Sequence, residues 1–192
     1  MDRQIVEKTM PHTLVTGPIS EPVDLADAKL HLRVDGIDED VLIDGYISAS
    51  RLSIEAYAGL ALLEQTWDLV LDTWPGSVID FNMGPVTSIL SVAVDGKVLS
   101  PDTYNLAPGL NARLIRTDGA SWPRPKSLAA GIVVRFACGF GATGSDVPRD
   151  VRHALLMTVA HWYENRELVP GTGDQLTPPV RRLLAPYRKL RL

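Results

Sequence analysis

The stretch Gly139–Gly144 contains three glycines at the spacing of the dinucleotide-binding fingerprint, after a strand-like run and before a helix-like one. In that fingerprint the glycines form a tight turn beside the pyrophosphate, and a second parallel strand ends in an acid that binds the ribose. Here the helix can start only at Pro148, and the acid about 20 residues further on, Glu164, falls within that helix. We therefore expect a strand-to-helix connection, with Asp146 as a candidate cap, and no nucleotide site.

Other sequence patterns of catalysis or metal binding are missing. No Gly-Lys-Ser or Gly-Lys-Thr of a phosphate-binding loop occurs, and the four histidines include no pair at the spacing of a zinc helix. Cys138 and His161 could act as nucleophile and base, but Cys138 continues the apolar alternation of residues 132–136, which favours a core cysteine. We expect no metal and no cofactor.

The densest group of polar and aromatic residues lies on a predicted helix and comprises His161, Trp162, Tyr163, Glu164, Arg166 and Glu167. Residues three and four apart are neighbours on a helix, so Tyr163 meets both Arg166 and Glu167. We interpret the run as a structural cluster whose hydrogen bonds lock a β lobe to the helices. The alternative is acid–base catalysis in a small cytoplasmic enzyme, a hydrolase or transferase that uses His161, Tyr163 and Glu164.

The composition limits the class of protein. At 192 residues the chain fits one domain that buries most of its apolar surface without a disulfide. A hydrophobic share of 45% and a charged share of 22% exclude a disordered or fibrous chain. The single cysteine and the lack of a leader pattern favour a cytoplasmic origin, and no apolar run approaches the roughly 18 residues that span a bilayer.

The net charge of −4 is unevenly distributed. Between Ser20 and Ala58 there are nine acids and three bases, whereas residues 175–192 contain five bases and no acid. Two solvated faces would account for this pattern. The other interpretation is that one end docks on an acidic partner or on a neighbouring subunit.

The positions of the elements follow from their periods. Helices are expected over residues 24–58 and 148–185, with Asp24 and Asp38 as N-caps and Gly59 as a stop. Between them the period changes to two, which predicts short strands over residues 66–72, 89–94, 97–99, 104–106, 113–116 and 132–138. Because no helix-length crossover separates these strands, they should pair antiparallel, and Asp95-Gly96 should form a two-residue hairpin turn.

These elements predict an α+β fold in which the N- and C-terminal helices form one helical body with an inserted small antiparallel β lobe. We expect an N-terminal arm over residues 1–19, a single domain over 20–185 with its β lobe at 64–140, and a basic C-terminal tail over 186–192.

Several short pieces occur in a characteristic order along nearly the whole chain. They include residues 18–29, 31–35 and 38–40, Gln65-Thr66-Trp67, Ser121-Trp122-Pro123, residues 136–141, Val147-Pro148, residues 161–167 and Leu184-Ala185-Pro186-Tyr187-Arg188. By the order and spacing of these pieces, the sequence resembles the small head-tail connector (adaptor) proteins of long-tailed bacteriophages and of the related gene transfer agents.

The resemblance implies a structural protein without enzymatic activity. It would form a ring, typically of twelve copies, beneath the portal of a phage-like particle, and would join the portal to a stopper or tail-side connector. DNA would pass non-specifically through its lumen, no membrane would take part, and synthesis would occur in the bacterial cytoplasm. A DNA-binding accessory is a further alternative, which the acidic balance disfavours.

The resemblance also implies a site. In the connector family the C-terminal segment reaches toward the portal. Portal-binding residues would therefore be Arg181, Arg182, Tyr187, Arg188, Lys189, Leu190, Arg191 and Leu192.

Overall fold

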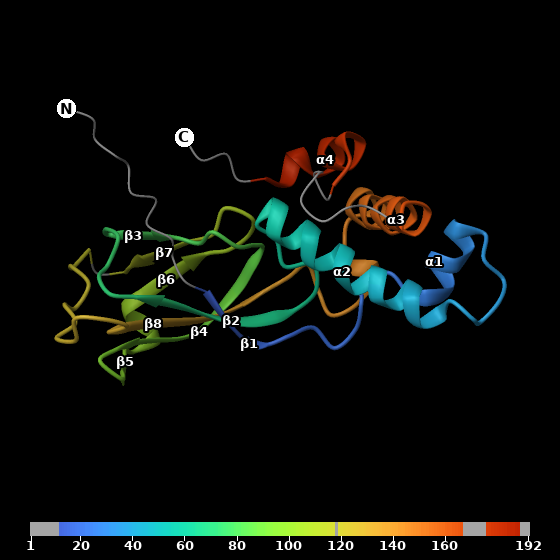
Figure 1. Ribbon diagram of the computed structural model, residues 1–192. Helices are drawn as coiled ribbons and strands as arrows, with labels where there is room; N and C mark the ends of the chain where they lie inside the picture. The colour runs from blue at the N-terminus through green and yellow to red at the C-terminus, as the bar shows by residue number, and fades with distance from the viewer. Residues whose placement is uncertain (1–11, 118, 167–175, 189–192) are drawn as a thin grey trace, which may run out of the picture.

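The computed structural model describes residues 12–117, 119–166 and 176–188, which form an elongated molecule with helices at one end and strands at the other (Figure 1). The helices are α1 (Leu25–Leu32), α2 (Asp40–Ala58), α3 (Arg149–Glu164) and α4 (Pro178–Leu184). The strands are β1 (His12–Thr16), β2 (Gln65–Leu71), β3 (Val78–Asp80), β4 (Val86–Val94), β5 (Lys97–Val98), β6 (Tyr104–Ala107), β7 (Arg113–Arg116) and β8 (Ile132–Cys138). The predicted α+β class is confirmed.

Parts of five predictions lie outside the described residues. They are residues 1–11 of the arm, residue 118 of the β lobe, residues 167–175 of the helical range, Glu167 of the cluster, and the tail residues Lys189, Leu190, Arg191 and Leu192.

The helix ends follow local capping chemistry, with one exception to the prediction. The Asp27 N–H donates to the Asp24 carboxylate at 2.7 Å, so Asp24 caps α1. Gly59 ends α2 in the left-handed region, with φ of 68°. The prediction that Asp38 caps α2 is wrong. A turn closed by the bond from the Asp40 N–H to the Ile37 carbonyl precedes the helix, which places Glu39 at the cap position.

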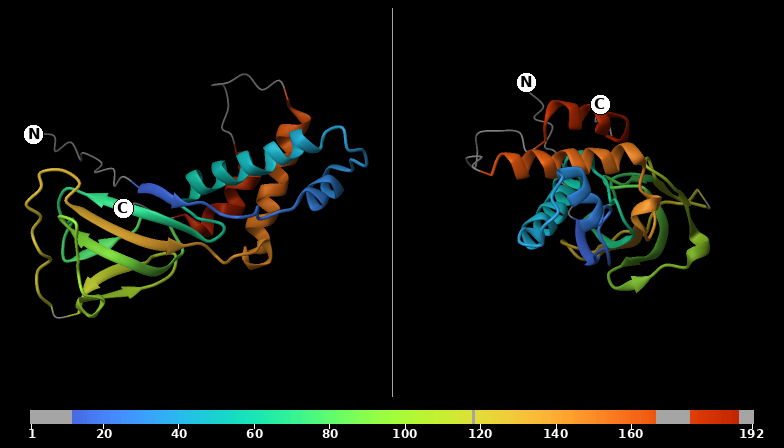
Figure 2. Two further views of the ribbon diagram at one scale, coloured as in Figure 1. Left: turned by 90° about the horizontal axis from the view of Figure 1, so that it is seen from below. Right: turned by 90° about the vertical axis from the view of Figure 1, so that its right-hand side faces the viewer.

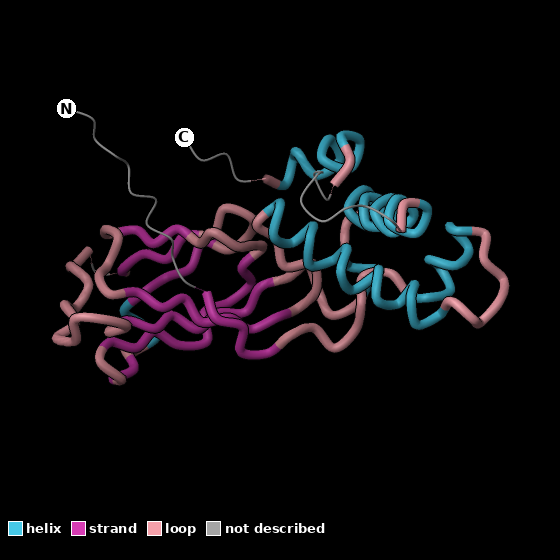
Figure 3. The backbone as a smooth tube through the Cα atoms, viewed as in Figure 1, coloured by secondary structure: helices cyan, strands magenta, loops and turns pink. Residues whose placement is uncertain are grey.

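The strands form two antiparallel sheets, drawn in magenta in Figure 3. The larger has the order β1-β2-β8-β4-β5 and the smaller the order β3-β7-β6. Strand β8 pairs on both sides, with β2 and β4. The predicted hairpin turn is present at Asp95 and Gly96, whose φ angles of 48° and 76° are the positive values that such a turn requires.

Part of the segment expected to form an arm is an edge strand. Strand β1 pairs with β2 and places Leu14 opposite Trp67. The expectation of an arm therefore does not hold for residues 12–16. Most residues of this strand are exposed, so the sequence carries no alternation of polar and apolar residues that would reveal it.

Two apolar cores correspond to the two ends of the molecule. One contains buried residues of all four helices, among them Ala28, Ile47, Leu155 and Val180. The other lies among the strands and includes Phe136 and Cys138, both fully buried. Cys138 is thus a core residue, as predicted, and burial raises the pKa of its thiol to about 12.

The glycine-rich connection from β8 to α3 serves close packing. A Cβ at Gly139, whose φ is 134°, would lie 2.3 Å from the Leu63 carbonyl oxygen, and one at Gly144 would lie 2.3 Å from that of Pro22. Asp146 accepts a hydrogen bond from the Thr143 N–H at 2.9 Å, within a capping box around the 3₁₀ turn Gly144–Asp146. The glycines therefore let three chain segments meet, which is a structural reason for their spacing.

Candidate functional site

The C-terminal segment, which the resemblance assigns to portal binding, packs on the helical end of the molecule. Tyr187 donates its hydroxyl to the Asp150 carboxylate at 2.8 Å, at the start of α3. Burial and this bond to Asp150 raise the pKa of Tyr187 to about 12. The guanidinium of Arg188 lies 4.5 Å from the ring centre of Tyr57 on α2. Both residues thus attach the chain end to the domain.

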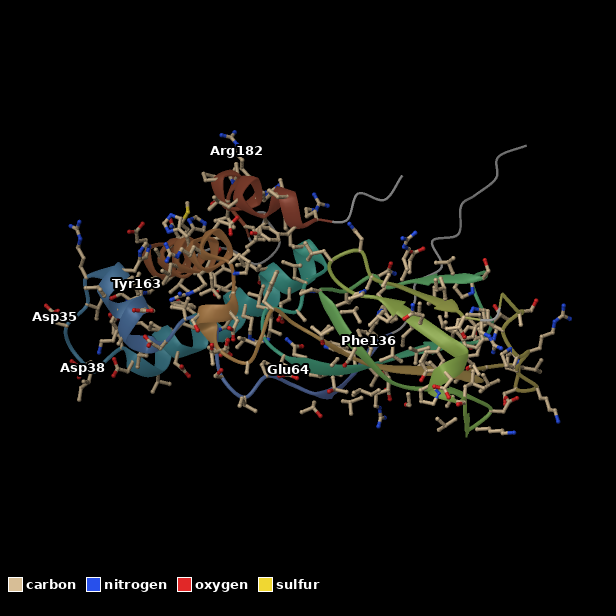
Figure 4. All side chains as sticks on the ribbon, turned by 180° about the vertical axis from the view of Figure 1, so that it is seen from behind. Asp35, Asp38, Glu64, Phe136, Tyr163 and Arg182 are labelled. Carbon is tan, nitrogen blue, oxygen red and sulfur yellow. The ribbon has the colours of Figure 1, made fainter. Side chains whose placement is uncertain are left out.

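The two arginines of α4 have different surroundings. Arg181 is half-buried, and its Nε donates to the Leu176 carbonyl at 2.8 Å, one turn earlier in the chain. Arg182 is exposed and points away from the molecule (Figure 4). Of the predicted portal-binding residues that the structure describes, Arg182 is exposed and points outward, whereas Arg181 and Tyr187 form hydrogen bonds within their own chain.

The predicted structural cluster forms around a residue that sequence reasoning missed. Glu39, between α1 and α2, accepts hydrogen bonds from the Tyr163 hydroxyl and from the Arg166 guanidinium, the latter at 2.6 Å. The hydrogen bonds from Tyr163 and Arg166 lower the pKa of Glu39, and the bond to Glu39 raises the pKa of Tyr163. The guanidinium also stacks on the Tyr163 ring, 4.4 Å from its centre.

The cluster therefore joins the end of α3 to the start of α2. Our interpretation that it locks the β lobe to the helices is wrong, because Tyr163 and Arg166 contact another helical segment. The sequence contained one signal, since Glu39 lies in an acidic run that begins a helix, but the run does not indicate its partner 124 residues away.

The remaining members do not converge on a catalytic arrangement within the described residues. His161 lies near Asn165, with 3.3 Å between its Nδ1 and the Asn165 Nδ2. Glu164 is exposed, and Trp162 packs edge-on toward Tyr46. The geometry offers no support for the alternative of a hydrolase or transferase that uses His161, Tyr163 and Glu164.

A cavity of about 630 Å³ lies at the outer end of the β lobe. Two stacked indoles, Trp74 and Trp122, form part of its wall, with ring centres 4.5 Å apart. The Trp74 N–H donates to the Pro123 carbonyl and the Trp122 N–H to that of Ser77. Both indole N–H groups thus hold the loops of the lobe in place. Neither histidine nor cysteine is among the described residues that line the cavity.

The described residues contain neither a metal-binding cluster nor a membrane-spanning helix. No group of three or more His, Cys, Asp or Glu side chains could hold a metal ion. No described helix is both long and apolar enough to cross a membrane.

The surface carries apolar residues that the sequence analysis did not single out. On α2 they include Val41, which is 89% exposed, and Leu52, which is 57% exposed. At the outer loops, Ile37 and Leu128 are 79% and 97% exposed. The period of a helix offers a partial signal, because apolar residues that repeat along one face of α2 imply an exposed face opposite.

Comparison with known proteins yields a family match and a shared fold. Residues 22–95 match the family model described as phage gp6-like head-tail connector protein. No curated protein matches the sequence.

Among solved structures the chain is similar to one in the virion of a native gene transfer agent (GTA) particle, with a TM-score of 0.77 and 23% identity. It is also similar to a chain in the neck of an empty GTA particle computed with C6 symmetry, with a TM-score of 0.80 and 24% identity. A third similar chain lies in the neck of a native GTA particle computed with C12 symmetry, with a TM-score of 0.78 and 23% identity. Each comparison covers 95% of this chain and 97% of the other. The resemblance to head-tail connector proteins that the sequence predicts is therefore confirmed, by the family model over residues 22–95 and by a shared fold over nearly the whole chain.

Proposed function

We propose that this protein is a structural head-tail connector, which forms a ring at the neck of a phage-like particle, joins the capsid portal to a tail-side protein, and continues the DNA channel. The observation that carries the proposal is the fold shared over 95% of the chain with a neck computed with C12 symmetry. The symmetry of that neck supports a ring of like subunits, and we propose twelve copies in the particle.

The surface of the chain supports a structural role. Several large apolar residues are exposed along α2 and at loop tips, where partners can reach them. The overall acidic balance suits a channel through which DNA must slide, because it avoids firm contact with phosphates. We assign no catalysis and no cofactor to it.

The helices of both chain halves would act as one body in this assembly. Buried residues from α1 to α4 share one apolar core, and the β lobe is attached through the glycine-rich connection. The C-terminal tail, residues 186–192, would anchor the ring on the portal, since residues 176–192 contain five bases and no acid.

Co-expression with the portal protein encoded in the same genome tests the function. We expect the two proteins to purify together, and electron microscopy to show a ring of twelve connector copies stacked on the portal ring. A connector that neither purifies with the portal nor appears in the necks of particles made in the same host would refute the proposal. Binding to duplex DNA with a steep dependence on salt would instead favour the DNA-binding accessory.

A further inference from the structure

We infer that the outward face of α2 is the contact surface for a second copy of this chain, and that it meets α4 of that copy. The inference rests on the proposed ring and names the two surfaces that would close it. The outward face of α2 is defined by Val41, Gly45, Ala49, Leu52 and Ala56.

These five residues lie on one side of the helix and are exposed. Their spacing of three and four residues places them within about 80° of one another around the axis. None of them is charged, although solvent-facing positions of a helix are normally polar. Two are large apolar side chains, Val41 and Leu52. A Cβ at Gly45 would have no atom within 4 Å, so the centre of the face is open for another helix.

The exposed face of α4 is also apolar, but with a basic residue. It consists of Pro178, Pro179 and Arg182 of the helix, continued by Ala185 and Pro186 of the 3₁₀ turn that follows. Arg182 projects from its centre (Figure 4). No acidic residue occurs from Leu176 to Arg188.

The two faces are complementary in charge. The exposed charged residues near the α2 face are mostly acids: Asp44 on the helix, and Asp35 and Asp38 in the preceding loop, which Figure 4 shows pointing outward; one exposed base, Arg33, begins that loop. The base within α2, Arg51, is only 11% exposed and is paired with Glu21 at 2.8 Å. An acidic rim around one apolar face thus matches the arginine at the centre of the other.

The arrangement of the helices suits a contact in which α2 of one copy meets α4 of the next. Helix α3 packs against α2 on one side and against α4 on the other, as the right-hand view of Figure 2 shows. The outward faces of α2 and α4 therefore point away from α3 in different directions. Docking α2 on α4 of the next copy would continue the order α2-α3-α4 from copy to copy. Such a heterologous contact closes into a ring when the rotation allows it.

Cross-linking tests the contact directly. The native Cys138 is fully buried, so cysteines introduced by Ala49→Cys and Ala185→Cys would be the reactive ones. With a short bismaleimide, the double variant should give a ladder of dimers, trimers and larger species, because each copy carries both halves of the contact. A matched control, Ala49→Cys with Leu90→Cys on β4, should stay monomeric.

Every other outcome overturns the inference. Dimers from Ala49→Cys alone would show that α2 meets α2. Linkage of Ala49→Cys to the portal, without links between copies, would show that the portal covers α2. A double variant that forms no ladder at near-millimolar concentration would show that the two faces do not meet.

Surface variants in the same cross-linking background provide a second test. Gly45→Trp and Leu52→Glu should each lower the yield of the ladder by about tenfold, since they block or charge the centre of a contact. Leu90→Glu, at a position that is 54% exposed on β4, should leave the yield unchanged. Thermal unfolding of all three should match that of the parent, because none of these side chains supports the core. An unchanged yield for Gly45→Trp would contradict the inference.

The two proposals can fail separately. A protein that assembles on the portal but gives no ladder would retain its function and lose this contact. One that gives the ladder but never joins the portal or the neck would retain the contact and lose the function.

Discussion

Glu39 is the residue that connects the two long helices. Its carboxylate accepts from Tyr163 and Arg166, and both bonds lower its pKa. A carboxyl group whose pKa is lower in the folded than in the unfolded chain adds stability above its unfolded pKa, about 4.3, and loses it as the pH falls through the folded value. We predict that Glu39→Gln lowers the melting temperature at pH 7, and that this difference shrinks as the pH is lowered below about 4. Calorimetry of the parent and the variant between pH 7 and about pH 3 measures the difference in melting temperature and its dependence on pH.

A control for this prediction lies at the end of α3, next to Tyr163. Glu164 is exposed, and Glu164→Gln should leave the melting temperature unchanged at every pH. If the two variants behaved alike, or if the effect of Glu39→Gln were independent of pH, the charged state of Glu39 would not stabilise the fold.

Cys138 offers a probe of global unfolding. Its thiol is fully buried and its pKa is raised to about 12, so almost no thiolate exists near neutral pH. We predict that a thiol reagent at pH 8 labels the native protein only as fast as the protein unfolds, and that labelling becomes immediate in denaturant. Rapid labelling of folded protein would show that the β-lobe core opens locally.

At the scale of elements, the connection from β8 to α3 depends on the absence of side chains. A Cβ at Gly139 or at Gly144 would overlap a backbone carbonyl, and backbone cannot move aside as a flexible side chain can. We predict that Gly139→Ala and Gly144→Ala each destabilise the protein by about 1–3 kcal/mol, measured by denaturant unfolding. Gly76→Ala is the matched control, since its Cβ would lie 3.8 Å from the nearest atom. Equal stabilities would refute the packing role.

The elements with a clear period were the ones that could be predicted. Strand β8 has the predicted bounds, because its apolar alternation spans the whole strand. Strand β3 was missed, since only one of its three residues is buried. The cap of α2 was misplaced by one residue, because several adjacent acids can each serve as a cap and the preceding turn decides among them.

At the scale of the whole molecule, the nature of the site stays a prediction. The charge asymmetry allows either two solvated faces or a docking end, and the exposure of Arg182 is compatible with both. Arg181 and Tyr187, in contrast, form hydrogen bonds within their own chain, to Leu176 and Asp150. The sequence does not distinguish these roles, because a charged or aromatic side chain near a chain end can pack inward as readily as outward. The role of Glu39 depends on contacts distant in sequence, which local periods do not describe.

The C-terminal segment combines a folding role with the proposed anchoring role, and the two can be separated by where the chain is cut. A chain that stops after Pro186 loses the Tyr187 bonds to Asp150 and the Arg188 contact with Tyr57. We predict that it unfolds with a free energy lower by on the order of 2 kcal/mol, the typical size for hydrogen bonds to a charged group. A chain that stops after Arg188 keeps these contacts, and should unfold like the full chain while losing co-purification with the portal. Normal portal binding by this second truncation would show that residues 189–192 do not anchor the ring, and equal stability of the first would show that Tyr187 and Arg188 do not hold the chain end in place.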